Sequence, residues 1–313
     1  MINLEIDQEI INKATTWESE GEKLALAIVV KTWGSSPRQP GSMMLIREDG
    51  HIIGSVSGGC VEGAVIVGSK NILQSNKAEL MEFGVADEDA WSVGLSCGGR
   101  ITVFVCPGSK IESGLFQKAL KAQEDRSNLS IECDLTQGTI TTLRDTLLSN
   151  DSFFRMQIIP RPRLFIVGAV HISQQLIPMA QISGFDVNLI DPRSHFASEE
   201  RFPDLNILTE WPDEALSKEN LGPNDALVTL THDPKIDDPA LLVALKSPLF
   251  CISCLGSKKT HEKRKSRLID AGISEQDFNR INGPAGLKIN AKTPAEIAVS
   301  ILSELIKKWR ESL

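Results

Sequence analysis

Two cysteines, Cys60 and Cys97, are each flanked by a pair of glycines. The neighbours are Gly58 and Gly59 before Cys60, and Gly98 and Gly99 after Cys97. Glycine leaves a neighbouring thiol unscreened and lets a ligand or another backbone approach closely. Cys60 also lies where a helical pattern begins, and unpaired N–H groups there favour a thiolate, a persulfide or a bound anion. Because most free cysteines are buried apolar residues, the residue types alone leave a functional or a structural role open.

The remaining cysteines fit a structural role. Cys106 and Cys133 lie in apolar segments, and we expect them to be core residues. Cys251 and Cys254 have C-x-x-C spacing but fall within a predicted strand, where residues three apart face opposite sides. A shared metal or a redox disulfide is therefore not expected at this pair.

A loop over residues 34–41 combines glycine, serine and proline with one arginine, Arg38. A guanidinium and backbone N–H groups can hold a phosphate or a carboxylate. A purely structural Pro/Gly turn is equally compatible with the same residues.

Gly168 begins a loop between a predicted strand and a predicted helix, as in a dinucleotide-binding fingerprint. The second and third glycines of that G-x-G-x-x-G pattern are replaced by Val170 and Ser173. Asp191 ends the next strand, where an acid can bind a ribose hydroxyl. The pattern predicts a Rossmann-type fold whose candidate nucleotide-binding residues include Gly168, His171 and Asp191. It leaves open a bound NAD(P), another phosphorylated ligand, or a scaffold without a dinucleotide.

His232 and Asp233 follow a later strand of the same half and are further candidates for nucleotide contact. Ligands of open α/β sheets bind beyond the carboxyl ends of the strands. Asp237 and Asp238 come shortly afterwards, so two acids and a histidine could hold a metal ion. A helix N-terminus also favours acidic residues, and we prefer that interpretation.

Hydrophobic patterning predicts a mixed α/β first half and a more regular second half. The first half has expected helices at 5–20 and 61–73, and strands at 24–30, 43–47, 51–56, 80–85 and 100–106. Residues 107–162 carry a weaker pattern, with a helix at 111–123 and a hairpin at 129–135 and 139–143. We interpret that stretch as the tail of the first domain plus a linker, ending near Pro160.

The second half alternates strands with helices, which predicts a parallel sheet with right-handed crossovers. Its expected strands are 164–167, 187–190, 207–208, 226–230 and 249–255, and its expected helices are 171–183, 196–202, 213–218, 238–246, 258–271 and 295–311. Thr293, Pro294 and Glu296 form a start signal for the last helix. The predicted fold is thus an N-terminal mixed α/β domain (1–160) followed by a Rossmann-like parallel-sheet domain (161–313).

Composition limits the partners of this chain. It has 313 residues and a formal net charge of −8, which argues against binding to nucleic acid or an anionic membrane. The basic run 258–265 is interpreted as a solvated helix face. No signal peptide is visible, and the apolar run 24–30 is too short to span a bilayer, so we expect a cytoplasmic protein with reduced thiols.

Several motifs follow one another along nearly the whole chain: residues 32–38 (TWGSSPR), 54–63 (GSVSGGCVEG), 94–99 (GLSCGG), 167–171 (VGAVH), 191–193 (DPR), 230–234 (LTHDP), 255–257 (LGS) with Thr260 and His261, and 283–287 (GPAGL). In this order they resemble the motifs of the xanthine dehydrogenase accessory proteins, the XdhC/CoxI family.

The resemblance implies a non-catalytic maturation factor that binds a molybdopterin-type molybdenum cofactor. It implies support of cofactor sulfuration with a cysteine desulfurase, delivery to a xanthine dehydrogenase-type enzyme, and a homodimer. Cys60 and Cys97 would face the molybdenum or its sulfur, with Arg38 and Glu62 in support. The alternatives are an NAD(P)-dependent oxidoreductase that uses the Rossmann domain, and a ligand-sensing interaction protein. The incomplete glycine fingerprint argues against the oxidoreductase.

Overall fold

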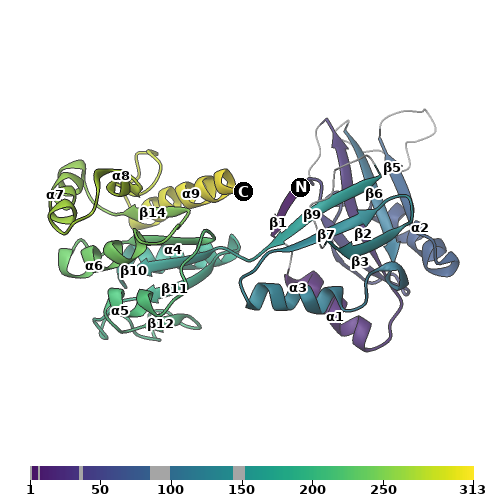
Figure 1. Ribbon diagram of the computed structural model, residues 1–313, viewed down its shortest axis with the longest axis horizontal. Helices are drawn as coiled ribbons and strands as arrows, with labels where there is room; N and C mark the ends of the chain where they lie inside the picture. Colours follow the sequence, from purple (N-terminus) through teal and green to yellow (C-terminus); the bar gives the residue numbers. More distant parts are fainter. Residues whose placement is uncertain (1, 6–7, 35–37, 85–98, 144–151) are drawn as a thin grey trace. The chain divides into compact units, whose positions relative to one another are not determined.

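The computed structural model describes residues 2–5, 8–34, 38–84, 99–143 and 152–313. The chain divides into two compact units, Met1–Pro160 and Arg161–Leu313 (Figure 1). The first unit contains two sheets and three α-helices among its described residues, and the second is built on one parallel sheet. The predicted fold class, a mixed α/β unit followed by a Rossmann-like unit, is confirmed.

The first unit is organised by a five-stranded antiparallel sheet with the order β4-β3-β2-β6-β5. Its strands are β2 (Leu24–Trp33), β3 (Met43–Arg47), β4 (Ile52–Gly54), β5 (Glu79–Phe83) and β6 (Arg100–Pro107). The predicted hairpin is β3 and β4. The predicted helix that follows it is α2 (Glu62–Ser75).

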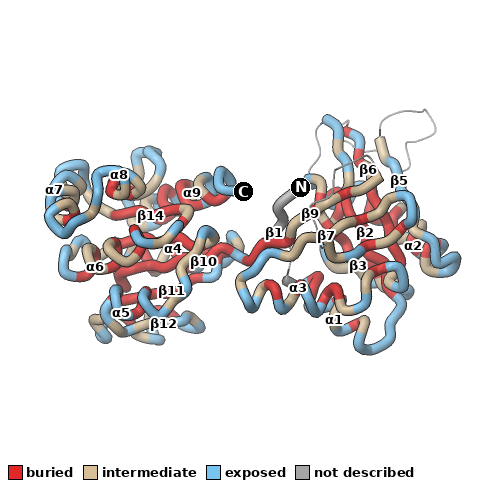
Figure 2. The backbone as a smooth tube through the Cα atoms, in the orientation of Figure 1, coloured by how far each residue is buried: buried red, intermediate tan, exposed pale blue. Residues whose placement is uncertain are grey.

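The central strand β2 is buried on both faces, which explains its continuous apolar sequence (Figure 2). Leu24, Leu26 and Ile28 enter one core, while the small residues Ala25 and Ala27 enter the other. The second core also holds Val61, Val65 and Ile72, so α2 covers that face of the sheet.

The linker predicted before Pro160 is wrong, because this stretch contributes to a second, four-stranded sheet. This sheet has the order β1-β9-β7-β8 and consists of β1 (Ile2–Glu5), β7 (Leu129–Asp134), β8 (Thr139–Thr142) and β9 (Phe153–Ile159). The stretch before Pro160 is therefore part of the folded unit. The expected helix at 5–20 begins only at Gln8 (α1, Gln8–Ser19), because the residues before it pair with β9 as a parallel strand. The helix α3 (Leu115–Glu124) packs beside α1 in the first core.

The second unit contains six parallel strands in the order β12-β11-β10-β13-β14-β15, the order of a doubly wound fold. The strands are β10 (Arg163–Val167), β11 (Asp186–Ile190), β12 (Asn206–Leu208), β13 (Asp225–Thr229), β14 (Cys251–Cys254) and β15 (Ile281–Asn282). The helices are α4 (His171–Ile182), α5 (Pro212–Ser217), α6 (Pro234–Ala244), α7 (Lys258–Asp270), α8 (Glu275–Phe278) and α9 (Pro294–Ser312).

Alternate residues of β10 feed two cores, one on each face of the sheet. Leu164 and Ile166 pack with residues of α4 and α9, and Phe165 and Val167 pack with residues of α5, α6 and α7. The predicted start of α9 is confirmed, because Thr293 and Glu296 form a reciprocal capping box behind Pro294.

One expected helix of this unit is wrong, and two elements were not predicted. Residues 196–202 form turns, since Arg201 Nη1 donates to the carbonyl oxygens of Phe196 and Ala169 and holds the chain in an irregular path. The short elements α8 and β15 carry too few residues for a periodic signal. Within the part of the chain that the structure describes, no helix has the length and apolar content needed to cross a membrane.

Candidate functional site

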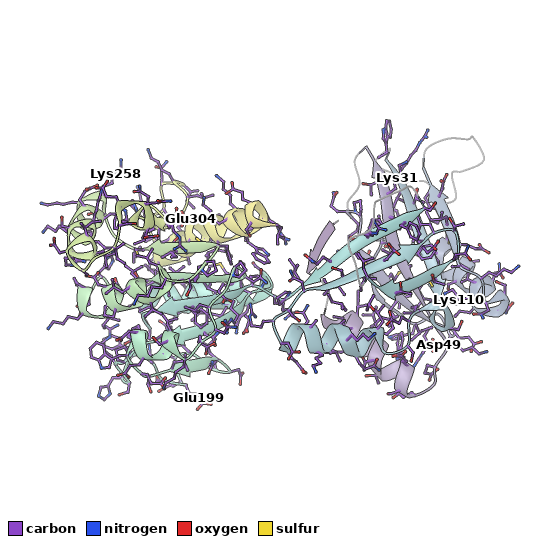
Figure 3. All side chains as sticks on the ribbon, viewed as in Figure 1. Lys31, Asp49, Lys110, Glu199, Lys258 and Glu304 are labelled. Carbon is purple, nitrogen blue, oxygen red and sulfur yellow. The ribbon has the colours of Figure 1, made fainter. Side chains whose placement is uncertain are left out.

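Described residues of three predicted motifs lie at one end of the five-stranded sheet. Trp33 at the end of β2 pairs with Arg100 at the start of β6, and Gly54 at the end of β4 pairs with Met44. The last residues of β2, β4 and β5 therefore share this end, which we call the loop end. Figure 3 shows Lys31 toward the loop end and Asp49 at the opposite end of the sheet. The loop end includes Arg38, Cys60 and Gly99, while Cys97 and Gly98 lie outside the described residues.

The loop before α2 is gathered around one carboxylate, that of Glu62, which is only 8% exposed. The donors to Oε1 are Ser55 Oγ at 2.6 Å, Val56 N at 3.2 Å, Ser57 N at 2.8 Å and Gly58 N at 3.1 Å. The donors to Oε2 are Ser57 Oγ at 2.5 Å and Gly59 N at 2.9 Å. A carboxylate with this many donors fixes the loop as one rigid turn.

The charge of Glu62 is stabilised by these contacts. Burial alone would raise the pKa of Glu62, but hydrogen bonds from Ser55 and Ser57 lower that pKa to about 2. The group is therefore an anion at neutral pH, and the loop is folded around it.

A second acceptor, Ser57 Oγ, completes the turn. It accepts hydrogen bonds from Cys60 N and Val61 N, each at 3.0 Å. Helix α2 begins at Glu62, with Val61 as its N-cap. The prediction of an unpaired N–H group at Cys60 is thus wrong, because the loop provides its own acceptors.

Cys60 itself is exposed at the tip of this turn. Gly58 and Gly59 before it have φ angles of 82° and 118°, a region that residues with a side chain rarely occupy. A Cβ on Gly59 would meet no atom within 4 Å, so conformation rather than crowding explains glycine there. The loop offers an accessible sulfur donor on a fixed backbone.

Other residues of the loop end are also exposed. Arg38 lies on the surface of the β2–β3 connection. Trp33 is 68% exposed, and the guanidinium of Arg100 lies 5.7 Å from its ring centroid. Gly99 is buried next to Arg100. The loop end therefore carries both an exposed indole, which offers an apolar contact, and an accessible thiol, which is a soft ligand.

The four cysteines expected in the cores are buried, which confirms that prediction. They are Cys106, Cys133, Cys251 and Cys254. Burial raises the pKa of Cys106 to about 12, so that thiol stays protonated. Among the described residues, no group of three or more His, Cys, Asp or Glu side chains could hold a metal ion.

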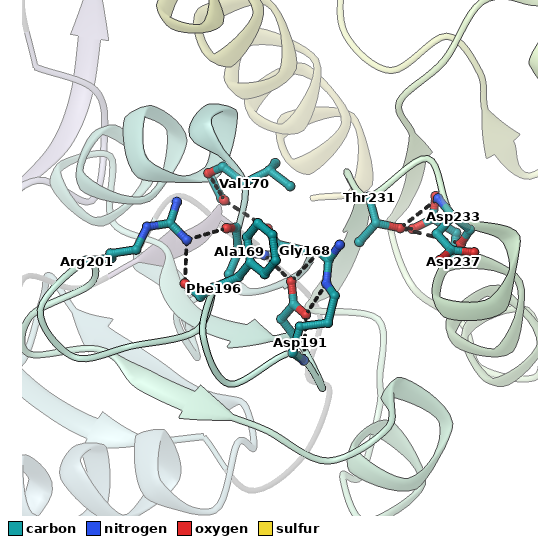
Figure 4. A network of polar contacts seen from close by, with 11 residues as sticks. Gly168, Ala169, Val170, Asp191, Phe196, Arg201, Thr231, Asp233 and Asp237 are labelled. Carbon is teal, nitrogen blue, oxygen red and sulfur yellow. Dashed lines mark hydrogen bonds and ion pairs between the residues drawn. The ribbon is translucent and has the colours of Figure 1, made fainter.

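In the second unit, Gly168 allows two loops to approach closely (Figure 4). Its φ is 117°, and a Cβ there would lie 2.8 Å from Thr231 Cγ2 and 3.2 Å from Thr231 N. Ser173, at the position of the third fingerprint glycine, donates from its hydroxyl to the carbonyl oxygens of Gly168 and Val170. The remaining glycine therefore serves the contact between the β10 and β13 loops.

Asp191 is fully buried, and its carboxylate is engaged within the protein. It accepts hydrogen bonds from Ala169 N at 2.7 Å and from the backbone N, Nε and Nη2 of Arg193 at 2.7–2.9 Å. Burial would raise the pKa of Asp191, but the Arg193 and Ala169 contacts lower it. A ribose would have to displace Arg193 to reach this carboxylate.

The other candidate nucleotide residues lie at the carboxyl edge of the same sheet. His171 is exposed at the first position of α4. His232 is exposed in a left-handed conformation (φ 63°), and Asp233 is the N-cap of α6, where its side chain accepts from Lys235 N. This cap confirms the preferred interpretation of the acidic cluster. Asp237 is buried and accepts from Thr231 Oγ1 at 2.6 Å.

Comparison with known proteins agrees with the resemblance. Residues 164–305 match the family description "XdhC Rossmann domain", and residues 17–84 match "XdhC and CoxI family". The chain belongs to the XdhC and CoxI family. In this family member the two matches cover both the parallel sheet and the Glu62 loop.

Relatives of this XdhC and CoxI family member are known in several bacteria. A Bacillus subtilis protein named as a probable subunit of xanthine dehydrogenase is 29% identical over 91% of this chain and 93% of its own length. "Molybdenum cofactor insertion chaperone PaoD" of Escherichia coli is 26% identical over 91% of this chain and 83% of its own length. "Uncharacterized protein YqeB" of E. coli is 27% identical over 95% of this chain, which spans only 46% of that relative. A crystal structure described as a xanthine dehydrogenase from Bacillus halodurans has a TM-score of 0.79 and 26% identity, with 96% of both chains covered.

Another motif shared with the family has a structural explanation. The segment Gly283–Leu287 lies against α9, where Gly286 N donates to the buried Glu304 at 3.1 Å. Ser300 Oγ donates to Leu287 O, and a Cβ on Gly286 would clash with that hydroxyl. The motif thus joins α9 to the edge of the sheet.

Proposed function

We propose that this protein is a molybdenum cofactor-binding chaperone that assists insertion of the cofactor into a xanthine dehydrogenase-type enzyme. The observation that carries the proposal is the exposed thiol of Cys60, held on a turn that Glu62 makes rigid. The names of the relatives support it, since one is a molybdenum cofactor insertion chaperone and another is a probable component of xanthine dehydrogenase.

The chemistry of the loop end suits such a cargo. A thiolate is a soft ligand for a metal with sulfur ligands. The N–H groups of residues 56–61 are used by Glu62 and Ser57, so they would not hold the phosphate of the cofactor. In this proposal the exposed cations Lys31 and Arg38 carry that role, with Cys97 as a second thiol.

A carrier must also release its cargo to another protein. The exposed ring of Trp33 supplies the apolar centre of a transient contact with the client enzyme. Sulfuration with a cysteine desulfurase and assembly as a homodimer belong to the same proposal and rest on the family resemblance.

Purification from a host that makes molybdopterin tests this proposal. We expect bound pterin with the wild-type protein and a strong loss of pterin in Cys60→Ala. Ser75→Ala is the matched control, because Ser75 is an exposed residue at the far end of helix α2, the helix that follows Cys60. Equal pterin contents in Cys60→Ala and Ser75→Ala would contradict the role of the thiol.

The alternative of an NAD(P)-dependent oxidoreductase gains no support from the geometry of the Gly168 loop. Arg193 and Ala169 already engage Asp191, and Arg201 Nη1 donates to the carbonyl oxygen of Ala169. Saturable binding of NAD(P) with cofactor turnover would revive that alternative.

A further inference from the structure

A basic pocket lies in the second unit, beyond the carboxyl ends of β13 and β14. Its volume is about 420 Å³, and it is lined by the loop after β13 and by one face of α7. Lys259, Lys263 and Arg267 are spaced four residues apart along that helix, so they lie on one face. Arg264 and His232 also line the pocket. The basic run 258–265, which we interpreted as a solvated helix face, therefore also lines a pocket.

Few of these cations form an ion pair with a carboxylate. Arg267 is paired with Asp238 at 2.6 Å. Within the described part of the chain, Lys259, Lys263 and Arg264 form no ion pair within 4.0 Å of a carboxylate. Such a concentration of positive charge is unusual in a chain whose formal net charge is −8.

Arg264 is the strongest indication that the pocket accepts an anion. Its side chain is almost entirely buried, at 2% exposure. Nη2 donates to Leu255 O at 3.1 Å and Nη1 lies 3.4 Å from His261 Nδ1, while Nε has no hydrogen-bond partner among the described residues. A buried charge without a hydrogen-bonded counter-ion is destabilising, so an anion in the adjoining pocket would relieve it.

The one acid among the lining residues, Asp237, interacts with Arg264 through charge but forms no ion pair with it within 4.0 Å. It accepts a hydrogen bond from Thr231 Oγ1 at 2.6 Å, on the side of the β13 loop. Burial raises the pKa of Asp237, against the opposing effects of Thr231 and Arg264.

The backbone at the start of α7 adds donors. Ser257 is the N-cap, with its hydroxyl accepting from Thr260 N at 3.1 Å, and the N–H groups of the first helical turn have no acceptor within the helix. Gly256 has a φ of 145°, and a Cβ there would lie 3.1 Å from Thr260 Cγ2, so this glycine lets the β14 loop fold closely over the helix start. A strand, a glycine turn and a helix N-terminus form a geometry suited to phosphate.

We propose that this pocket binds the phosphate group of a small phosphorylated molecule, with Lys259, Lys263 and the first turn of α7 as its direct contacts and Arg264 as a buried counter-charge. The site is distinct from the Gly168 loop and does not depend on the function proposed for Cys60. A mononucleotide and a phosphorylated pterin share the chemistry that the pocket recognises.

Calorimetry on the full chain tests the proposal, with inorganic phosphate, AMP and a pterin phosphate ester as separate probes. We expect saturable binding of at least one phosphate ester, and a preference for AMP or the pterin ester identifies the source. The Lys259→Ala/Lys263→Ala variant should bind about tenfold or more weakly, the loss expected for one charge-assisted hydrogen bond or more. The Lys259→Arg/Lys263→Arg variant should retain binding.

The control is Lys246→Ala/Lys292→Ala, which removes two exposed lysines of the same unit that do not line the pocket. It should bind like the wild type. The proposal is overturned if no probe binds saturably, if the heat equals that of sodium chloride at matched ionic strength, or if the Lys259/Lys263 and Lys246/Lys292 variants lose affinity equally.

Discussion

Replacing Glu62 by glutamine removes the charge around which the Cys60 turn is built. The amide oxygen of Glu62→Gln can keep the four contacts made by Oε1, but its NH₂ group replaces Oε2 and faces Gly59 N, another donor. Gly59 N, which is part-buried, loses its acceptor at a cost of up to about 1–3 kcal/mol, and the remaining contacts lose their charge assistance. We therefore expect destabilisation of about 3 kcal/mol.

The pKa of Glu62 gives a second route to the same magnitude. Lowering this pKa from its usual 4.5 to about 2 corresponds to about 3 kcal/mol in favour of the ionised form. Because the pKa is depressed in the folded protein, this stabilisation is complete above the unfolded pKa and declines as the pH falls toward the folded pKa. Its contribution should be less than half as large at about pH 3 as at about pH 7.

Urea denaturation of wild type and Glu62→Gln at both pH values measures these differences. Hydrogen exchange read by mass spectrometry provides a local measurement, and the amides of residues 56–61 should exchange faster in the variant. The control Glu79→Gln changes an exposed carboxylate on β5 and should stay within about 0.5 kcal/mol of the wild type. Unchanged stability together with unchanged protection of residues 56–61 would refute the reasoning.

Three further predictions concern the second unit, each measured by denaturation of the full chain. Gly168→Ala should destabilise by about 1–3 kcal/mol, because its φ of 117° and the approach of Thr231 leave no room for a Cβ; a neutral effect would contradict the close contact. Arg193→Ala should cost about 2 kcal/mol and raise the pKa of buried Asp191, and retained stability would show that this carboxylate has another partner. Thr293→Ala should cost about 1 kcal/mol by removing the capping box of α9, whereas Thr293→Ser should restore it.

Local sequence signals predicted most of the elements of both units. β2 and β10 were predicted as strands because they are apolar on both faces, and α9 was predicted because a complete N-terminal capping sequence precedes it. β1 was missed because its pairing with β9 joins residues more than 150 positions apart, which no local period reveals. The expected helix at 196–202 failed because contacts of Arg201 with distant carbonyls override local propensity.

The candidate site was predicted in residue type but not in its interactions. Glycine neighbours correctly suggested an exposed Cys60, yet nothing in the spacing indicated that Glu62 and Ser57 use the N–H groups around it. The basic pocket has a signal in the sequence, since Lys259, Lys263 and Arg267 recur every fourth residue on a predicted helix. Only the fold shows that this face meets the loop after β13.

X-ray absorption at the molybdenum edge tests the central claim, that Cys60 is the residue that holds the cofactor. The measurement uses protein purified with its cargo from a molybdopterin-producing host, for wild type, Cys60→Ala and Ser75→Ala. We predict that wild type and Ser75→Ala have a molybdenum–sulfur shell containing the Cys60 thiolate, and that Cys60→Ala loses this sulfur or the metal. Identical sulfur shells and molybdenum contents in all three proteins would contradict the account.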